Sequence, residues 1–164
     1  MGDFQVAKEN LLTYLQAGLA KLDFDGDLDL SWQKAERTFT LELTFYAQNL
    51  SGQEIIDASG VDSDQEIISF VDAILLYDEQ KPAEFDTADY LACLPFAGKA
   101  GWTKQQAAGF LAYLQEVVDN GQADLLDFLN EESETIFELK FDEEQLAKWV
   151  AKQNLSGNLA YPKF

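Results

Sequence analysis

Four aspartates form the most regular pattern of ionisable side chains in the sequence. They alternate with less polar residues over residues 23–30, at Asp23, Asp25, Asp27 and Asp29. A period of two is typical of a half-buried β-strand, which places these carboxylates on one face about 7 Å apart. Such a face favours a divalent cation or a basic protein surface, because both are attracted to clustered carboxylates. A solvated strand face that discourages edge pairing accounts for the pattern better than a metal site does.

The same segment does not fit an EF-hand calcium loop. Counted from Asp25, the sixth position of the loop is Leu30, where the sharp turn requires glycine. We expect Glu42 to face the aspartates across a hairpin if Trp32 pairs near Phe39, and the added like charge then costs stability. A cost without a structural return indicates a binding surface, as in proteins that imitate the phosphates of DNA.

A second candidate site combines a carboxylate in an apolar run with the one basic turn of an acidic chain. Asp72 lies within the run 67–77, where an ionised carboxylate requires a partner unless a sheet edge leaves it in water. Residues 98–104 link an expected strand to an expected helix, whose first amides can hold phosphate or carboxylate beside lysine. The candidate ligand-binding residues are Asp72, Lys99, Gly101, Trp102, Thr103 and Lys104. The turn fits neither glycine-rich nucleotide motif, so loop geometry and the packing of Trp102 are the competing interpretation.

The residue types that are absent exclude several classes of chemistry. The chain has no histidine, which excludes triads of the Ser-His-Asp or Cys-His type, imidazole bases and His-ligated zinc within one chain. Cys93 is the single cysteine, which excludes an internal disulfide and a cysteine metal cluster. It lies in the apolar run 90–94, so we expect a buried, inert thiol. We expect no cofactor and find no catalytic motif, although carboxylate pairs can catalyse acid–base chemistry without histidine.

The charge of the chain limits the kinds of partner it can bind, and its hydrophobic pattern indicates its compartment. Thirty acidic and 11 basic residues give a net charge of −19, which disfavours direct binding to nucleic acid and to anionic membranes. A basic protein is electrostatically favoured as a partner, and plain solubility explains the charge equally well. The first residues lack the pattern of a signal peptide, and no apolar run approaches the roughly 20 residues of a membrane helix. We therefore expect a cytoplasmic protein.

The hydrophobic pattern predicts a single α+β domain over residues 1–164. We expect a mainly antiparallel sheet of about five or six strands covered by about four helices. The expected strands are 23–32, 38–46, 54–58, 67–77, 90–96 and 136–141, with a hairpin loop at 33–37. The expected helices are 4–21, one from Thr103 to the Asn120-Gly121 pair, 125–129, and one after Asp142. Because it is almost continuously apolar, 67–77 is expected to be a central strand covered on both faces.

The strand 70–77, the turn 98–103 and the high acidity together resemble an uncharacterised family of small acidic cytosolic proteins. Its members occur in lactic-acid bacteria such as streptococci, enterococci and lactobacilli. The resemblance covers most of the chain, and it implies a bacterial cytosolic protein without a known activity, cofactor or catalytic residue.

Three functional interpretations follow from these patterns. The first is a non-enzymatic interaction protein whose acidic face, formed by Asp23, Asp25, Asp27, Asp29 and Glu42, binds a basic protein. The alternative is a small-ligand or carboxylate-dependent enzyme domain that uses Asp72 and the 98–104 turn. The third is a divalent-cation site on the aspartates.

Overall fold

A four-stranded mixed sheet in the order β1-β2-β3-β4 forms the centre of the fold. The computed structural model of the chain describes residues 9–48, 67–81, 84–130 and 138–162. The strands are β1 (Asp27–Gln33), β2 (Thr38–Gln48), β3 (Ile67–Asp78) and β4 (Ala92–Phe96). The pairs β1–β2 and β2–β3 are antiparallel, whereas β4 runs parallel to β3. The parallel pair forms because the chain returns along the sheet between β3 and β4, a connection that includes the short 3₁₀ helix η1 (Thr87–Asp89).

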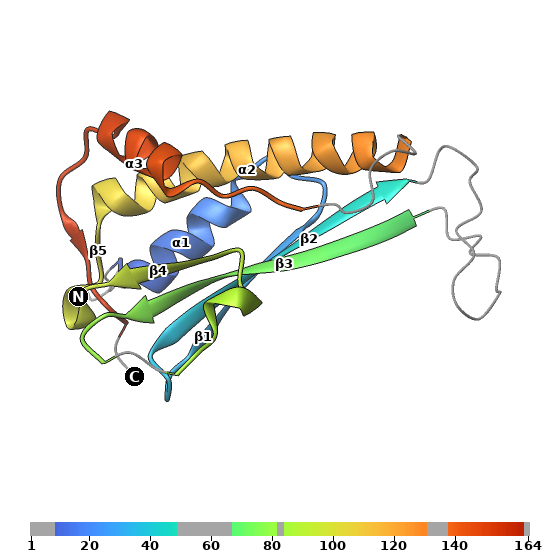
Figure 1. The fold of residues 1–164 in the computed structure, drawn as a ribbon. Helices are drawn as coiled ribbons and strands as arrows, with labels where there is room; N and C mark the ends of the chain where they lie inside the picture. The colour runs from blue at the N-terminus through green and yellow to red at the C-terminus, as the bar shows by residue number, and fades with distance from the viewer. Residues whose placement is uncertain (1–8, 49–66, 82–83, 131–137, 163–164) are drawn as a thin grey trace, which may run out of the picture.

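Three α-helices lie on one side of this sheet (Figure 1). They are α1 (Leu11–Ala20), α2 (Lys104–Asn130) and α3 (Glu143–Lys152). A capping box starts α1, because Asn10 accepts from the Thr13 amide at 2.9 Å and its own amide donates to the Thr13 hydroxyl. A second 3₁₀ helix, η2 (Gly98–Ala100), precedes a two-stranded antiparallel sheet of β5 (Trp102–Thr103) and β6 (Asn158–Leu159). None of the described helices has the length and apolarity needed to cross a membrane.

The pleat of the strands separates a covered face of the sheet from an outward face. Phe39, Leu41, Leu43 and Phe45 of β2 are completely buried beneath the helices, and the intervening residues of β2 point outward. The register places Ile74 and Leu76 of β3 on the same covered face. The hydrophobic core therefore lies between this face and the apolar sides of α1 and α2.

The predicted sheet and helix content is confirmed only as an α+β fold. The described residues contain a four-stranded mixed sheet, in which only the β3–β4 pair is parallel, a two-stranded sheet and three α-helices. Within these residues the main sheet therefore has fewer strands than the expected five or six, and the helices are fewer than the expected four. β3 is central, as predicted, but covered on both faces only toward its end, where Leu75 is buried on the outward side. Val71 of the same strand is 52% exposed. The predicted strand at 54–58 lies outside the described residues.

The predicted helix end at Asn120-Gly121 is wrong, because α2 continues through it to Asn130 and includes the predicted helix 125–129. Gly121 serves close packing instead of termination. A Cβ atom at this position would lie 2.5 Å from Leu139 and 2.9 Å from the ring of Phe45. A larger residue here would force the Leu139 side chain and the Phe45 ring to shift, so glycine fits the close approach of α2 to the sheet despite its low helix propensity.

The predicted strand 136–141 is also not found in its described part, residues 138–141. Leu139 is 8% exposed and packs into the core, which accounts for the apolar pattern without a paired strand. At the N-terminal side, the first helix is confirmed over Leu11–Ala20, and residues 4–8 of its predicted range lie outside the described residues. The hairpin loop predicted at 33–37 is confirmed over 34–37, and Gln33 is the last residue of β1.

A buried ion pair joins the β1–β2 hairpin to the end of β3. Arg37 Nε lies 2.6 Å from Asp78 Oδ2, and Asp78 is only 1% exposed. The guanidinium also lies over the ring of Tyr161 at 4.4 Å from its centroid. Arg37 adopts a left-handed backbone with φ of 56°, a costly conformation for a residue with a Cβ atom, which these contacts stabilise.

The partners of Asp78 hold its carboxylate in the ionised form. Burial by itself raises the pKa of Asp78, but the hydrogen bonds from Arg37 and from the Gln80 amide at 2.8 Å, together with the Arg37 charge, lower it. A carboxylate with a pKa lowered by folding stabilises the folded state above its unfolded pKa of about 4. That contribution is lost as the pH falls through the folded pKa.

We expect Asp78→Asn to lower the free energy of unfolding at pH 7 by about 3 kcal/mol, because it leaves a partly buried guanidinium without its counter-charge. Urea unfolding measures this difference, and the difference should shrink as the pH falls below 4. Glu36→Gln, an exposed change in the same hairpin loop, is the matched control and should have little effect. Equal stability of Asp78→Asn and Glu36→Gln would contradict the assigned role of the pair.

Candidate functional site

The predicted pairing of like charges across the β1–β2 hairpin is confirmed. Trp32 pairs with Phe39, and this register sets Asp29 directly opposite Glu42. Both side chains are exposed on the outward face of the sheet, the side that carries no α-helix in the described residues (Figure 1). Directly opposed like charges destabilise an antiparallel pair. Repulsion between these two carboxylates therefore lowers the stability of the hairpin, and the packing of the core does not require charged residues at these exposed positions.

The predicted ladder of four aspartates on one strand is corrected to two, because β1 begins only at Asp27. Asp23 precedes the strand, where the Gln115 side chain of α2 holds its backbone through two hydrogen bonds of 2.9 and 2.8 Å. Asp25 also precedes the strand and is exposed. Only Asp27 and Asp29 therefore occupy outward positions of β1.

The outward face has apolar and polar neighbours beside these carboxylates. Tyr46 is 40% exposed and donates from its hydroxyl to Asp27 at 2.6 Å, and this hydrogen bond raises the pKa of Tyr46. Val71 on β3 adds an exposed aliphatic side chain. Among the outward positions that the structure describes, none is a lysine or an arginine. The charged side chains of this face are therefore all acidic, and they lie among neutral polar and apolar residues.

The described residues offer no metal centre on this face or elsewhere. No group of three or more His, Cys, Asp or Glu side chains in that part of the chain is placed to hold a metal ion. The directly opposed pair of Asp29 and Glu42 supplies only two carboxylates, fewer than the oxygen ligands that calcium takes.

The basic turn at 98–104 packs against the C-terminal segment and forms hydrogen bonds with it. The Lys99 carbonyl accepts from the Tyr161 amide at 3.0 Å, and a Cβ atom on Gly101 would lie 2.1 Å from the Leu159 carbonyl. Lys104 forms an ion pair with Glu9 at 3.0 Å, and its amide donates to Gly157.

Thr103 is the residue before α2, and its hydroxyl accepts from the Gln106 amide at 3.0 Å, as the predicted helix start requires. Of the two lysines in the turn, Lys99 is exposed. Since the amides of Lys104 and Gln106 already have acceptors, the helix start offers less to an anion than its sequence indicated.

Asp72 lies on the covered face of the sheet, opposite Leu43 and just before β4 begins beside β3. It is half-buried, and Oδ1 accepts from the Ala73 amide at 2.8 Å. Burial raises the pKa of Asp72, while the hydrogen bond from Ala73 partly opposes this shift. Asp72 does not line the pocket described next, so that pocket does not unite it with the 98–104 turn.

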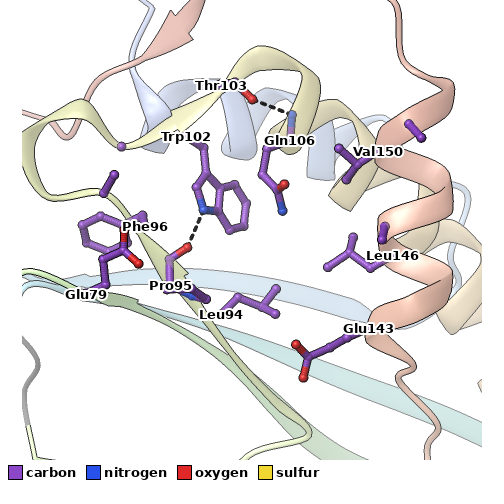
Figure 2. Close-up of a pocket in the computed structure, with 14 residues that line it drawn as sticks. Glu79, Leu94, Pro95, Phe96, Trp102, Thr103, Gln106, Glu143, Leu146 and Val150 are labelled. Carbon is purple, nitrogen blue, oxygen red and sulfur yellow. Dashed lines mark hydrogen bonds between the residues drawn. The ribbon is translucent and has the colours of Figure 1, made fainter.

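A pocket of about 590 Å³ lies beside β4, between this edge strand and α3. Figure 2 shows Trp102 at its centre, with Leu146 and Val150 of α3 on one side and Glu79 and Glu143 at its margins. The apolar lining comes mainly from β4, β5 and α3, and Thr103 and Gln106 add polar atoms. Of the predicted ligand-binding residues, Gly101, Trp102 and Thr103 line it, whereas Asp72, Lys99 and Lys104 do not.

The two acidic residues of this pocket were not identified from the sequence. Glu79 follows β3, and Glu143 is in the first turn of α3, which Asp142 caps by accepting from the Glu144 amide at 2.9 Å. The sequence explains Glu143 as a helix-stabilising residue, because a carboxylate in the first turn interacts favourably with the helix dipole. It does not indicate that Glu143 lines a pocket. Nothing local relates Glu79 to it, since the two residues are distant in the sequence.

Cys93 on β4 is less buried than the buried, inert thiol that the sequence predicts. It is half-buried, and two effects raise the pKa of its thiol. Burial is the larger effect, and the nearby charge of Glu143 is the smaller one. A thiol with a raised pKa is mostly protonated at neutral pH, and the protonated form is a poor nucleophile.

Comparisons with known proteins identify relatives but no activity. A family profile described as "Protein of unknown function (DUF3013)" matches residues 6–163. A solved structure, "Crystal Structure of Conserved Protein of Unknown Function from Enterococcus faecalis", is 33% identical. The alignment covers 98% of this chain and 100% of that chain, with a TM-score of 0.85. No curated protein matches the chain.

We expect Asp72→Asn to raise the melting temperature at pH 7 by a small amount. The folded pKa of Asp72 lies above its unfolded value, so the ionised side chain opposes folding at high pH, and this cost disappears as the pH falls through the folded pKa. The amide of asparagine can still accept from Ala73. Thermal unfolding at pH 7 and near pH 3 tests this, and the gain should be confined to pH 7. An equal gain from Asp25→Asn, an exposed aspartate, would contradict it.

We expect Cys93 to react with iodoacetamide more slowly at pH 8 than a free thiol does, because its thiolate fraction is smaller. Glu143→Gln removes one of the two causes of the raised pKa and should shift the pH dependence of alkylation to lower pH. Glu144→Gln is the neighbouring control and should leave the profile closer to that of the wild type. An unchanged profile in Glu143→Gln would show that burial alone controls the thiol.

Proposed function

The chain belongs to DUF3013, a family of proteins of unknown function, and we propose that it is a non-enzymatic protein whose acidic sheet face binds a basic surface of another protein. This acidic sheet face consists of Asp27, Asp29, Glu42, Tyr46 and Val71. The proposal includes the cytoplasm of lactic-acid bacteria as its setting. The related structure from Enterococcus faecalis supports that range of hosts.

The direct opposition of Asp29 and Glu42 carries the proposal. A sheet that served only as a scaffold would gain stability from an oppositely charged or neutral pair at these positions. The two carboxylates would instead gain from a lysine or arginine of a partner, because each new ion pair also relieves their mutual repulsion. The exposed positions of both residues leave their carboxylates accessible to such a partner.

The surroundings of the pair support a protein partner. The net charge of −19 attracts cationic surfaces over the range of the Debye length and repels nucleic acid. Tyr46 and Val71 add contact area of the kind found in protein interfaces, where aromatic and aliphatic groups lie among polar ones. The basic groove of a nucleic-acid-binding protein is one surface with the required charge.

Affinity capture from a lysate of the host at low salt, with a high-salt wash, tests the proposal. The bait is the tagged wild-type protein, compared with the double variant Asp29→Asn/Glu42→Gln. We expect a basic partner that binds the wild type and is lost from the double variant and in high salt, because the interaction is electrostatic. Thermal unfolding of the double variant should show equal or higher stability, since the repulsion is removed.

The matched control is Asp127→Asn/Glu144→Gln, which removes the same amount of charge from exposed positions of α2 and α3. It should retain the partner, because the overall charge is equal in the two variants and only the location differs. A partner that both double variants lose equally would indicate diffuse attraction to an acidic protein, and a partner that both retain would exclude the sheet face. Either result would overturn the proposal.

A further inference from the structure

We propose that the pocket between β4 and α3 binds a small organic cation, an amine with a compact apolar body, through Glu79 and Glu143. This site is separate from the acidic sheet face, since none of its lining residues belongs to that face. The inference therefore goes beyond the proposed protein interaction and does not depend on it.

The interior of the pocket is suited to the apolar part of such a ligand. Leu94, Trp102 and Leu146 are at most 5% exposed and form its buried wall. Ala147 and Val150 extend that wall along α3. The volume of about 590 Å³ lies within the range of small-molecule sites, which are mostly apolar with a few polar groups that orient the ligand.

The charged lining determines the sign of the ligand. Glu79 and Glu143 are the charged side chains that line the pocket, and both are carboxylates. Within the described residues, the ion pairs are Arg37–Asp78 and Lys104–Glu9, so neither pocket carboxylate has an internal counter-charge there. Figure 2 shows the two side chains at separate margins of the pocket, on either side of the Trp102 and Leu94 region. A cation gains Coulomb energy from them, whereas an anion is repelled.

The edge of β4 favours a compact ligand over an added peptide strand. Pro95 has no amide hydrogen, and its carbonyl already accepts from Trp102 Nε1 at 2.8 Å, as Figure 2 shows. Addition of a peptide strand requires free backbone donors and acceptors along the edge of the sheet. At Pro95 the donor is absent and the acceptor is already occupied. The indole of Trp102 thus fills part of the space beside the edge and supplies an aromatic surface between the two carboxylates, and such a surface attracts a cation.

The α3 wall of the pocket is held in place by contacts that need no ligand. Gln105 of α2 donates to the Val150 carbonyl at 3.0 Å. A Cβ atom on Gly109 would lie 2.5 Å from Val150 Cα, so glycine at this position lets the two helices approach closely. The Tyr113 hydroxyl accepts from the Asp142 amide at 2.8 Å at the start of α3. A preorganised site binds its ligand more tightly, because fewer side chains and backbone segments have to become ordered on binding.

Binding of hexylamine, followed by NMR at the assigned indole N–H of Trp102 and by thermal shift, tests the inference with the intact chain. We expect saturable binding of hexylammonium and at least tenfold weaker binding of hexanol, which lacks the charge. Methylammonium, which lacks the apolar body, should also bind at least tenfold more weakly, since diffuse attraction to the acidic surface is common to both amines. Equal effects of hexylamine and methylamine would overturn the inference.

The variants separate the pocket from the general charge of the protein. Glu79→Gln and Glu143→Gln should each weaken hexylamine binding about tenfold, whereas Glu144→Gln, adjacent on α3 but outside the pocket, should change it less than twofold. Ala147→Phe should block the pocket without altering charge, and circular dichroism confirms that each variant is folded. Equal loss in Glu143→Gln and Glu144→Gln, or full binding in Ala147→Phe, would overturn the inference. Neither outcome bears on the acidic sheet face, whose variants are tested separately.

Discussion

The buried pair of Arg37 and Asp78 beneath Tyr161 is the constraint on which the rest of the structure depends. It fixes the β1–β2 hairpin against the end of β3, where the chain leaves the antiparallel part of the sheet. Tyr161 covers the guanidinium and accepts from the Trp32 indole at 2.7 Å, so the C-terminal segment closes over the same point. Phe96 stacks on Tyr161 with ring centroids 5.4 Å apart, which ties in β4 as well. One partly buried charge pair and the tyrosine over it thus connect four separate parts of the chain.

This arrangement produces two surfaces of different character. With the α-helices on one side of the sheet, the outward strand positions near Asp29 and Glu42 remain in water, where opposed carboxylates are tolerated because solvent screens them. The parallel strand β4 forms the edge of the sheet opposite β1, and a pocket remains between this strand and α3. A broad acidic face suits a macromolecular partner, and an apolar pocket with two carboxylates suits a small cation. The two proposals rest on different residues and are independent.

Much of the local structure could be predicted from the sequence, because it depends on neighbours along the chain. The period-2 pattern and the polar loop at 33–37 predict the hairpin, and once Trp32 pairs with Phe39 the register places Glu42 opposite Asp29. Apolar spacing defines the first helix, and the Thr103 cap defines the start of α2. The prediction failed at Gly121, where a residue that usually ends helices instead gives room to the side chains of Phe45 and Leu139. No local pattern carries that information.

The sequence by itself determined the excluded chemistry, the hairpin and its like-charge pair, since these follow from residue types and short-range periodicity. The tertiary structure alone decided that β4 is parallel to β3 and that Glu79 and Glu143 line one pocket. It also decided the pairing of Asp78 with Arg37, two residues that are 41 positions apart in the sequence. The physical reason is that desolvation and packing depend on which distant segments meet, and local patterns fix only the segments themselves.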